Sequence, residues 1–173
     1  MMTHSPAQET EILRAVASFL IHRGALPYRF SVPRGKGINT GETTDYLRQW
    51  FGKAGFEPEF SSHGADVEAL SDTEWWRIEC KGIGSGKSQT HRNNFDRALA
   101  SVVTYFEEPP YPLGEKNQNV QLCLGLAVPT SPTFLHQINR RVRSPLRKRL
   151  NLWILLCEQP SGVVRAVSPS ENC

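Results

Sequence analysis

Two acidic residues and a lysine in the middle of the sequence have the types and the spacing of a catalytic group. Glu79 and Lys81 lie two positions apart in the segment EWWRIECK, so on a β-strand both side chains project from the same face. Asp66 lies earlier in the chain, at a distance that fits two short strands joined by the turn LSDT. If these strands pair as a hairpin, Asp66 and Glu79 become neighbours on one face of a sheet.

Such a set suits the hydrolysis of a phosphodiester, because the phosphoryl group repels nucleophiles and gains negative charge during the reaction. Two carboxylates can hold Mg²⁺, a hard cation that prefers oxygen ligands and keeps several waters. The metal polarises the phosphoryl oxygen and lowers the pKa of a bound water, and a lysine beside it can orient or deprotonate that water or stabilise the developing charge. We therefore predict that Asp66, Glu79 and the main-chain carbonyl of Cys80 bind Mg²⁺, for which Mn²⁺ can substitute, and that Lys81 is catalytic.

The elements that would position these residues follow from the spacing of apolar side chains. Residues 8–22 have helical spacing, and a second helix follows that Thr43 or Thr44 would cap. The period then changes to two, which predicts three strands, at 56–62, 65–70 and 74–81. In the third strand Glu79 and Lys81 point to one side and Cys80 to the other.

The second half of the chain alternates helices and strands. The apolar run at 119–128 is expected to be a strand covered on both faces, and Pro145 should break or kink the basic helix predicted at 133–150. The remaining elements are a helix, a central strand and an edge strand, at 90–106, 152–158 and 162–167. This order predicts an α/β sandwich with a central mixed β-sheet flanked by helices.

Composition bounds the class of protein. A chain of 173 residues that is 39% hydrophobic and 21% charged can bury a core, so we expect a single domain rather than a disordered chain. Its four cysteines are far apart, which favours buried thiols over a zinc site. The N-terminus has no signal-peptide pattern and no apolar run reaches ~20 residues, so no membrane association and a cytoplasmic location are expected.

The acidic and basic residues together resemble the PD-(D/E)XK nuclease superfamily, which includes many restriction endonucleases, Holliday-junction resolvases and repair nucleases. The matching segments are GADVEA, which contains Asp66, and WRIECKG, which contains Glu79 and Lys81. The resemblance covers a core of roughly residues 40–158 and departs from the signature at Gly64-Ala65, where the signature has proline. It implies a restriction-endonuclease-like sandwich over residues 1–173 and a metal-dependent endonuclease.

Three further residues are secondary candidates for the site. The leading helix of the superfamily often supplies another acid, which points to Glu42 as a metal ligand, although a carboxylate at a helix N-terminus is also stabilising by itself. Glu68 lies on the same side of its strand as Asp66, so it either faces the metal or forms an ion pair with Arg77. Gln89, before the next helix, either acts with the catalytic residues or is a solvated helix start.

Two other motifs fit less well. The segment GIGSGKS resembles a phosphate-binding loop, but Lys81 stands where the pattern requires its first glycine, so nucleotide hydrolysis is rejected. His63 and His91 lie near Asp66 and Gln89 respectively, but a histidine-metal nuclease needs several converging histidines. We interpret both as polar residues of a loop and of a helix start.

Basic residues are gathered in three segments. They are candidates for binding nucleic-acid phosphates, and they are Arg34 and Lys36 in an early loop, Lys87 and Arg92 after the acidic strand, and Arg140, Arg141 and Arg143 within a basic stretch that extends to residue 149. A solvated helix face is the alternative for that stretch. The net charge of +3 is compatible with a nucleic-acid ligand without establishing one.

The sequence thus predicts a Mg²⁺-dependent endonuclease that hydrolyses phosphodiester bonds in DNA, with RNA disfavoured because the chain has no RNP-like aromatic motif. One such centre cuts one strand at a time, so a double-strand cut would suggest a homodimer. The first alternative is a non-cleaving nucleic-acid-binding module of a defence, repair or transposition complex. The second is an α/β protein in which these charged residues form an ion-pair network.

Overall fold

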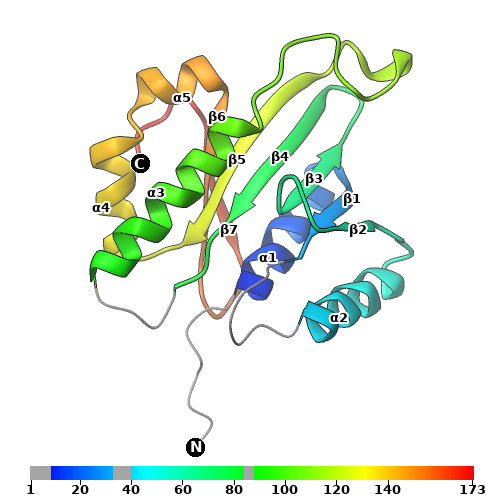
Figure 1. Cartoon of the computed structure of the whole chain (residues 1–173), viewed down its shortest axis with the longest axis horizontal. Helices are drawn as coiled ribbons and strands as arrows, with labels where there is room; N and C mark the ends of the chain where they lie inside the picture. The colour runs from blue at the N-terminus through cyan, green and yellow to red at the C-terminus, as the bar shows by residue number, and fades with distance from the viewer. Residues whose placement is uncertain (1–8, 33–39, 84–87) are drawn as a thin grey trace, which may run out of the picture.

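A single mixed sheet organises the computed structural model, which describes residues 9–32, 40–83 and 88–173 (Figure 1). Its strand order is β2-β1-β3-β4-β5-β6-β7. The strands are β1 (Leu26–Ser31), β2 (Glu59–Ser61), β3 (Val67–Leu70), β4 (Glu74–Cys80), β5 (Gln121–Pro129), β6 (Leu152–Cys157) and β7 (Val164–Val167). The helices are α1 (Glu9–His22), α2 (Thr40–Lys53), α3 (Ser88–Thr104), α4 (Pro132–Arg141) and α5 (Ser144–Leu150), with a 3₁₀ turn η1 (Glu115–Asn117).

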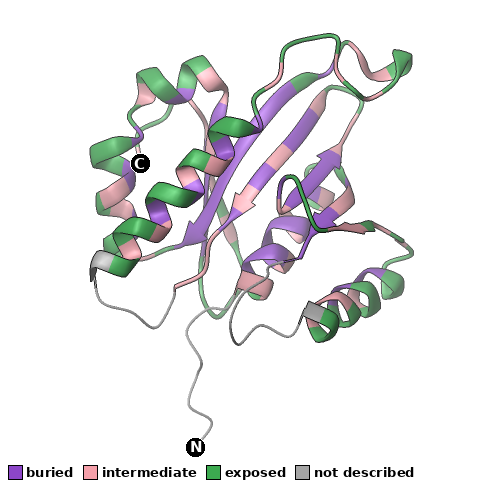
Figure 2. Ribbon diagram, in the orientation of Figure 1, coloured by how far each residue is buried: buried purple, intermediate pink, exposed green. Residues whose placement is uncertain are grey.

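Helices cover both faces of the sheet, which confirms the prediction of an α/β fold with a mixed sheet flanked by helices. Strands β4, β5 and β6 are parallel, as are β1 and β2, whereas β1–β3, β3–β4 and β6–β7 pair antiparallel. Side chains of α1 and α2 pack against one face, and those of α3 and α4 against the other. Figure 1 shows α3 crossing the front of the sheet, and Figure 2 shows buried residues along β4 and β5.

Strand β4 has the alternation that its sequence predicts. Trp76, Ile78 and Cys80 lie in the core on the α1 face, whereas Trp75 lies in the core on the α3 face, because successive strand residues point to opposite sides. The neighbouring β5 contributes to both cores, as predicted. A Cβ at Gly125 would lie 2.7 Å from Ile78 Cγ1, so this position requires glycine for β4 and β5 to pack closely.

The structure differs from the predicted elements in two details and confirms a third. The short strand β1 is not among the predicted elements; its Pro27 lies at an irregularity in register between Pro27 and Arg29, a place where strands tolerate proline. Helix α2 begins at Thr40, so Thr43 and Thr44 lie inside it and do not cap it. The predicted break at Pro145 is confirmed: the basic stretch forms two helices, α4 and α5. Pro145 stands in the first turn of α5, where proline is tolerated.

The cysteine prediction is confirmed: all four thiols are free, and Cys80, Cys123 and Cys157 are buried. Among the described residues, no helix combines the length and the apolar character that crossing a membrane would need.

Candidate functional site

The hairpin of β3 and β4 brings Asp66 and Glu79 together. Val67 pairs with Ile78 in the antiparallel register, so Asp66, one residue before β3, lies across from Glu79. The Oδ2 atom of Asp66 accepts a hydrogen bond of 2.8 Å from the main-chain N–H of Cys80. This bond extends the ladder beyond β3 and fixes the Asp66 side chain at the end of β4.

Burial and mutual repulsion disfavour charge on both carboxylates. Burial, reinforced by the Glu79 and Glu9 carboxylates, raises the pKa of Asp66 well above its ordinary value, against the opposing effects of the Cys80 N–H and Lys81. Burial also raises the pKa of Glu79; a hydrogen bond from Tyr105 opposes the shift, and Glu9 adds to it. Three carboxylates therefore share this region with the ammonium of Lys81, which leaves an excess of negative charge.

Glu9 belongs to this region although the sequence did not indicate it. It lies in the first turn of α1, and its Oε2 is 3.2 Å from Lys81 Nζ. The apolar stripe of residues 8–22 located the helix, but it carries no information on where the first turn meets the sheet. The expectation that a leading helix supplies an acid pointed instead to Glu42, which is exposed in the first turn of α2; its role as a metal ligand stays a prediction.

Glu68 has a different environment, although it is only two residues from Asp66. Its side chain is 4% exposed, and its Oε1 lies 3.7 Å from Arg77 Nε and 4.0 Å from Arg29 Nη1. The Tyr28 hydroxyl donates a hydrogen bond of 2.6 Å to its Oε2. Of the two alternatives for Glu68, the structure supports the ion pair with Arg77, because this carboxylate is already compensated by cations.

Tyr105 is a second residue that the sequence did not indicate. It directly follows α3, and its hydroxyl lies 2.5 Å from Glu79 Oε2 and 3.3 Å from the carbonyl oxygen of Gly64. Ser101, one helical turn earlier, also interacts with Glu79. A tyrosine at the end of a predicted helix belongs to no motif that would mark it as a site residue.

Several predicted residues lie outside the described part of the chain. Arg34, Lys36 and Lys87 are among them, and so is the side chain of Gln89. Arg92 is exposed on α3. His63 is exposed beside Ser62, whose hydroxyl is 2.6 Å from its Nδ1, and His91 is half-buried on α3.

The basic stretch of α4 and α5 is not uniform. Arg140 and Arg143 are exposed, whereas Arg141 forms an ion pair with Asp96 of α3. Arg147 is 2% exposed and donates to the carbonyl oxygens of Ser168 and Glu171, so it has a structural role. The accessible part of this stretch is therefore smaller than the sequence suggests.

The donor atoms fit a hard cation better than zinc. In the part of the chain that the structure describes, no three His, Cys, Asp or Glu side chains are grouped so as to hold a metal by themselves. Magnesium does not require such a group, since it is usually bound through one or two carboxylates and keeps several waters. Asp66 and Glu79 supply two carboxylates. A strand residue directs its N–H and C=O to the same side, so we infer that the Cys80 carbonyl also faces Asp66.

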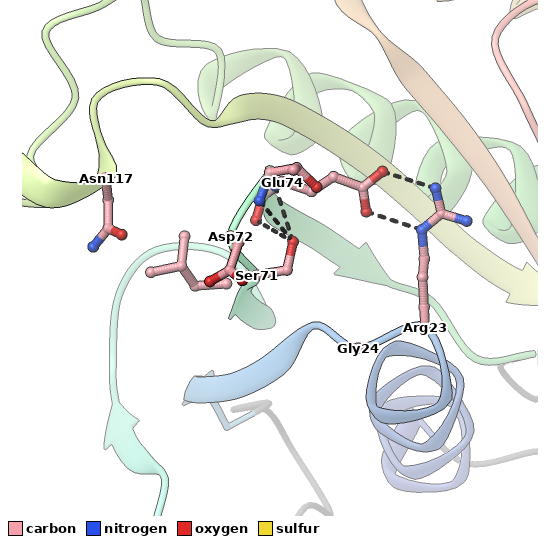
Figure 3. Close-up of a pocket in the computed structure, with 8 residues that line it drawn as sticks. Arg23, Gly24, Ser71, Asp72, Glu74 and Asn117 are labelled. Carbon is pink, nitrogen blue, oxygen red and sulfur yellow. Dashed lines mark hydrogen bonds and ion pairs between the residues drawn. The ribbon is translucent and has the colours of Figure 1, made fainter.

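A pocket of about 700 Å³ lies at the opposite end of β4, lined by Arg23, Ser71, Asp72, Glu74 and Asn117 among others. Figure 3 shows the Arg23 guanidinium directly against the Glu74 carboxylate, joined by two hydrogen bonds of 2.9 and 2.8 Å. The Ser71 hydroxyl interacts with the main chain of Glu74. The charged and polar groups of Arg23, Glu74 and Ser71 are already paired with one another. The pocket is therefore a weaker candidate for a catalytic site than the carboxylates at the other end of the strand.

Comparison with known proteins adds no assignment. No protein-family model matches the sequence, and neither the search of curated proteins nor that of solved structures gives a significant match.

Proposed function

We propose that the chain is a metal-dependent endonuclease that hydrolyses phosphodiester bonds in DNA and has a restriction-endonuclease-like fold. The observation that supports this most is the pairing of Asp66 with Glu79 on adjacent strands, in a region with more negative than positive charge. A divalent cation would relieve that excess. The D…E-x-K segment of the resemblance thus has both the spacing and the electrostatic environment that its chemistry requires.

Each residue has a part in this proposal. Asp66, Glu79 and the Cys80 carbonyl hold Mg²⁺, which supplies Lewis acidity and lowers the pKa of a bound water. Lys81 directs its ammonium toward the same region, where it orients the attacking water or stabilises charge on the phosphoryl oxygens. Glu9 lies 3.2 Å from Lys81 Nζ, so it holds the ammonium in place.

The substrate class rests on exposed positive charge on the helices that cover one face of the sheet. Arg92, Arg140 and Arg143 are exposed on α3 and on the segment from α4 to α5, which cover the sheet face to which Glu79 points. Phosphate contacts of this kind bind nucleic acid without reading its sequence. They favour a polyanionic substrate over a small phosphate ester.

Cleavage of supercoiled DNA in the presence of Mg²⁺ or Mn²⁺ tests the proposal. The wild type should nick or linearise the DNA, EDTA should stop the reaction, and Asp66→Asn and Lys81→Ala should be inactive while still binding DNA. Asp45→Asn and Lys53→Ala are matched controls, because both residues lie on α2, where Asp45 pairs with Arg48. DNA binding by the wild type without cleavage in either metal would favour the non-cleaving binding module instead.

A further inference from the structure

A chain of contacts runs from the centre of β4 to the carboxylate of Glu79. Arg77 Nη1 donates a hydrogen bond of 2.8 Å to the main-chain oxygen of Tyr105. The Arg77 guanidinium also lies over the Tyr105 ring, 5.4 Å from its centroid. Tyr105 in turn places its hydroxyl 2.5 Å from Glu79 Oε2. The guanidinium thus fixes both the main chain and the ring of the residue that contacts Glu79.

Arg77 is itself held firmly. Its side chain is 12% exposed and lies 3.7 Å from Glu68 and 2.5 Å from Glu107. The ring of Trp75 lies on another side, with its centroid 5.0 Å away. A buried guanidinium with two acidic neighbours and aromatic contacts has little freedom, so the position of Tyr105 relative to β4 is well determined.

We propose that Arg77 and Tyr105 are positioning residues for Glu79: Arg77 holds Tyr105, and the Tyr105 hydroxyl orients the Glu79 carboxylate toward a divalent cation. This inference rests on the proposed function, because it assigns Glu79 as a metal ligand. Ligating carboxylates in metal sites are commonly held by hydrogen bonds from a surrounding layer of residues, whose loss lowers metal affinity by 10–100-fold. The contacts of Tyr105 give it that role here.

The chain contains a matched control for this hydrogen bond. Tyr28, on β1, donates a hydrogen bond of 2.6 Å to Glu68, on the neighbouring strand β3. This contact joins the same two residue types as the contact between Tyr105 and Glu79, at nearly the same length. Glu68 is compensated by Arg29 and Arg77 and has no part in cation binding. Removing the two hydroxyls in turn therefore separates an effect on Glu79 from the general loss of a tyrosine–glutamate hydrogen bond.

The first measurement uses the metal-free protein. The carboxyl ¹³C resonance of Glu79, assigned by its loss in Glu79→Gln, should be narrow in the wild type and in Tyr28→Phe. In Tyr105→Phe it should be broadened, because the carboxylate then exchanges among rotamers. An unchanged resonance in Tyr105→Phe would overturn the positioning role whatever the protein does with metals.

The second measurement is calorimetric titration with Mn²⁺. Tyr105→Phe should bind Mn²⁺ about tenfold more weakly than the wild type, whereas Tyr28→Phe should be unchanged. An equal loss in both variants, or no loss in Tyr105→Phe, would contradict the inference. A wild type that binds no Mn²⁺ would refute the proposed metal site itself, a different result that leaves the resonance of Glu79 to decide whether Tyr105 orients it.

A double-mutant cycle tests the part played by Arg77. If Arg77 acts through Tyr105, Arg77→Lys should broaden the Glu79 resonance in the wild-type background and add little in Tyr105→Phe. Additive effects would separate Arg77 from Tyr105 and limit the positioning role to the tyrosine. Should Arg77→Lys fail to fold, the comparison of Tyr105→Phe with Tyr28→Phe still decides the inference.

Discussion

Strands β3 and β4 and the residue before β3 carry two groups of carboxylates that differ in how their charge is compensated: Glu68 is buried, whereas Asp66 and Glu79 are half-buried. Glu68 is surrounded by Arg29, Arg77 and the Tyr28 hydroxyl. Asp66 and Glu79, one step further along the same strands, share Lys81 with a third carboxylate, Glu9. Burial of a carboxylate therefore does not by itself indicate a functional site. What distinguishes the second group is that its carboxylates outnumber the cations beside them, so that their ionisation is disfavoured, which is a property expected of a functional site.

The largest expected effect is on cleavage. Asp66→Asn keeps the shape of the side chain and removes one anionic ligand, so we expect the rate of DNA cleavage to fall by at least about a thousandfold, since a bound metal supplies several kcal/mol of transition-state stabilisation. Glu68→Gln should still cleave DNA at a measurable rate when the rate is expressed per molecule of folded protein. Single-turnover assays in Mg²⁺ check both variants. Equal activity of Asp66→Asn and wild type would remove the functional distinction between the two groups.

The same two variants should have opposite effects on stability without metal. Glu68→Gln leaves Arg77 and Arg29 without a buried anionic partner, and breaking such a pair typically costs about 3 kcal/mol. Asp66→Asn should raise the free energy of unfolding, because it removes a charge whose ionisation is disfavoured in the folded chain. Urea denaturation at neutral pH measures both changes. If both variants are destabilised, the excess negative charge is not what separates the groups.

A smaller effect concerns pH. Burial and the Glu79 carboxylate raise the pKa of Asp66 in the folded chain, so the folded state keeps a proton that the unfolded chain has lost. Stability should therefore fall as the pH rises from the ordinary pKa of 3.8 through the raised value in the folded chain. The melting temperature followed from about pH 5 to about pH 8 should fall more in the wild type than in Asp66→Asn, and Mn²⁺ should reduce the difference. Parallel profiles for the two proteins would contradict the raised pKa.

The contrast between the groups also shows which parts of the site a sequence can reveal. The hairpin that pairs Asp66 with Glu79 depends on a two-residue period and a short turn, which are local properties. The sequence could not decide whether Glu68 is a metal ligand or a member of an ion pair. Asp66 and Glu68 share one side of the strand, and Arg77 is only one of several partners within reach of Glu68. Only the three-dimensional register, with Glu68 opposite Arg77, decides it.

Glu9 and Tyr105 could not be predicted as site residues, for a different physical reason. Both lie at helix ends, Glu9 in the first turn of α1 and Tyr105 just after α3. Helical periodicity indicates which face of a helix is buried, but it does not say how far the helix slides along the sheet or which strand its end meets. The position of each helix along the sheet is set by packing in the two hydrophobic cores. The helices could therefore be predicted from the sequence, whereas the residues that their ends bring to the site could not.

The smallest predicted effect concerns exposed basic residues of the segment from α4 to α5, which covers the sheet face to which Glu79 points. Arg140 and Arg143 are exposed, whereas Arg147 is buried and bound to main-chain carbonyls. Alanine at Arg140 or Arg143 should weaken DNA binding about equally for all sequences and reduce the slope of log affinity against log salt by about one. Arg48→Ala on α2 is the control, because Arg48 is exposed on the helix that packs against the other face. A change in slope as large for Arg48→Ala would place the nucleic acid away from the face that carries Glu79.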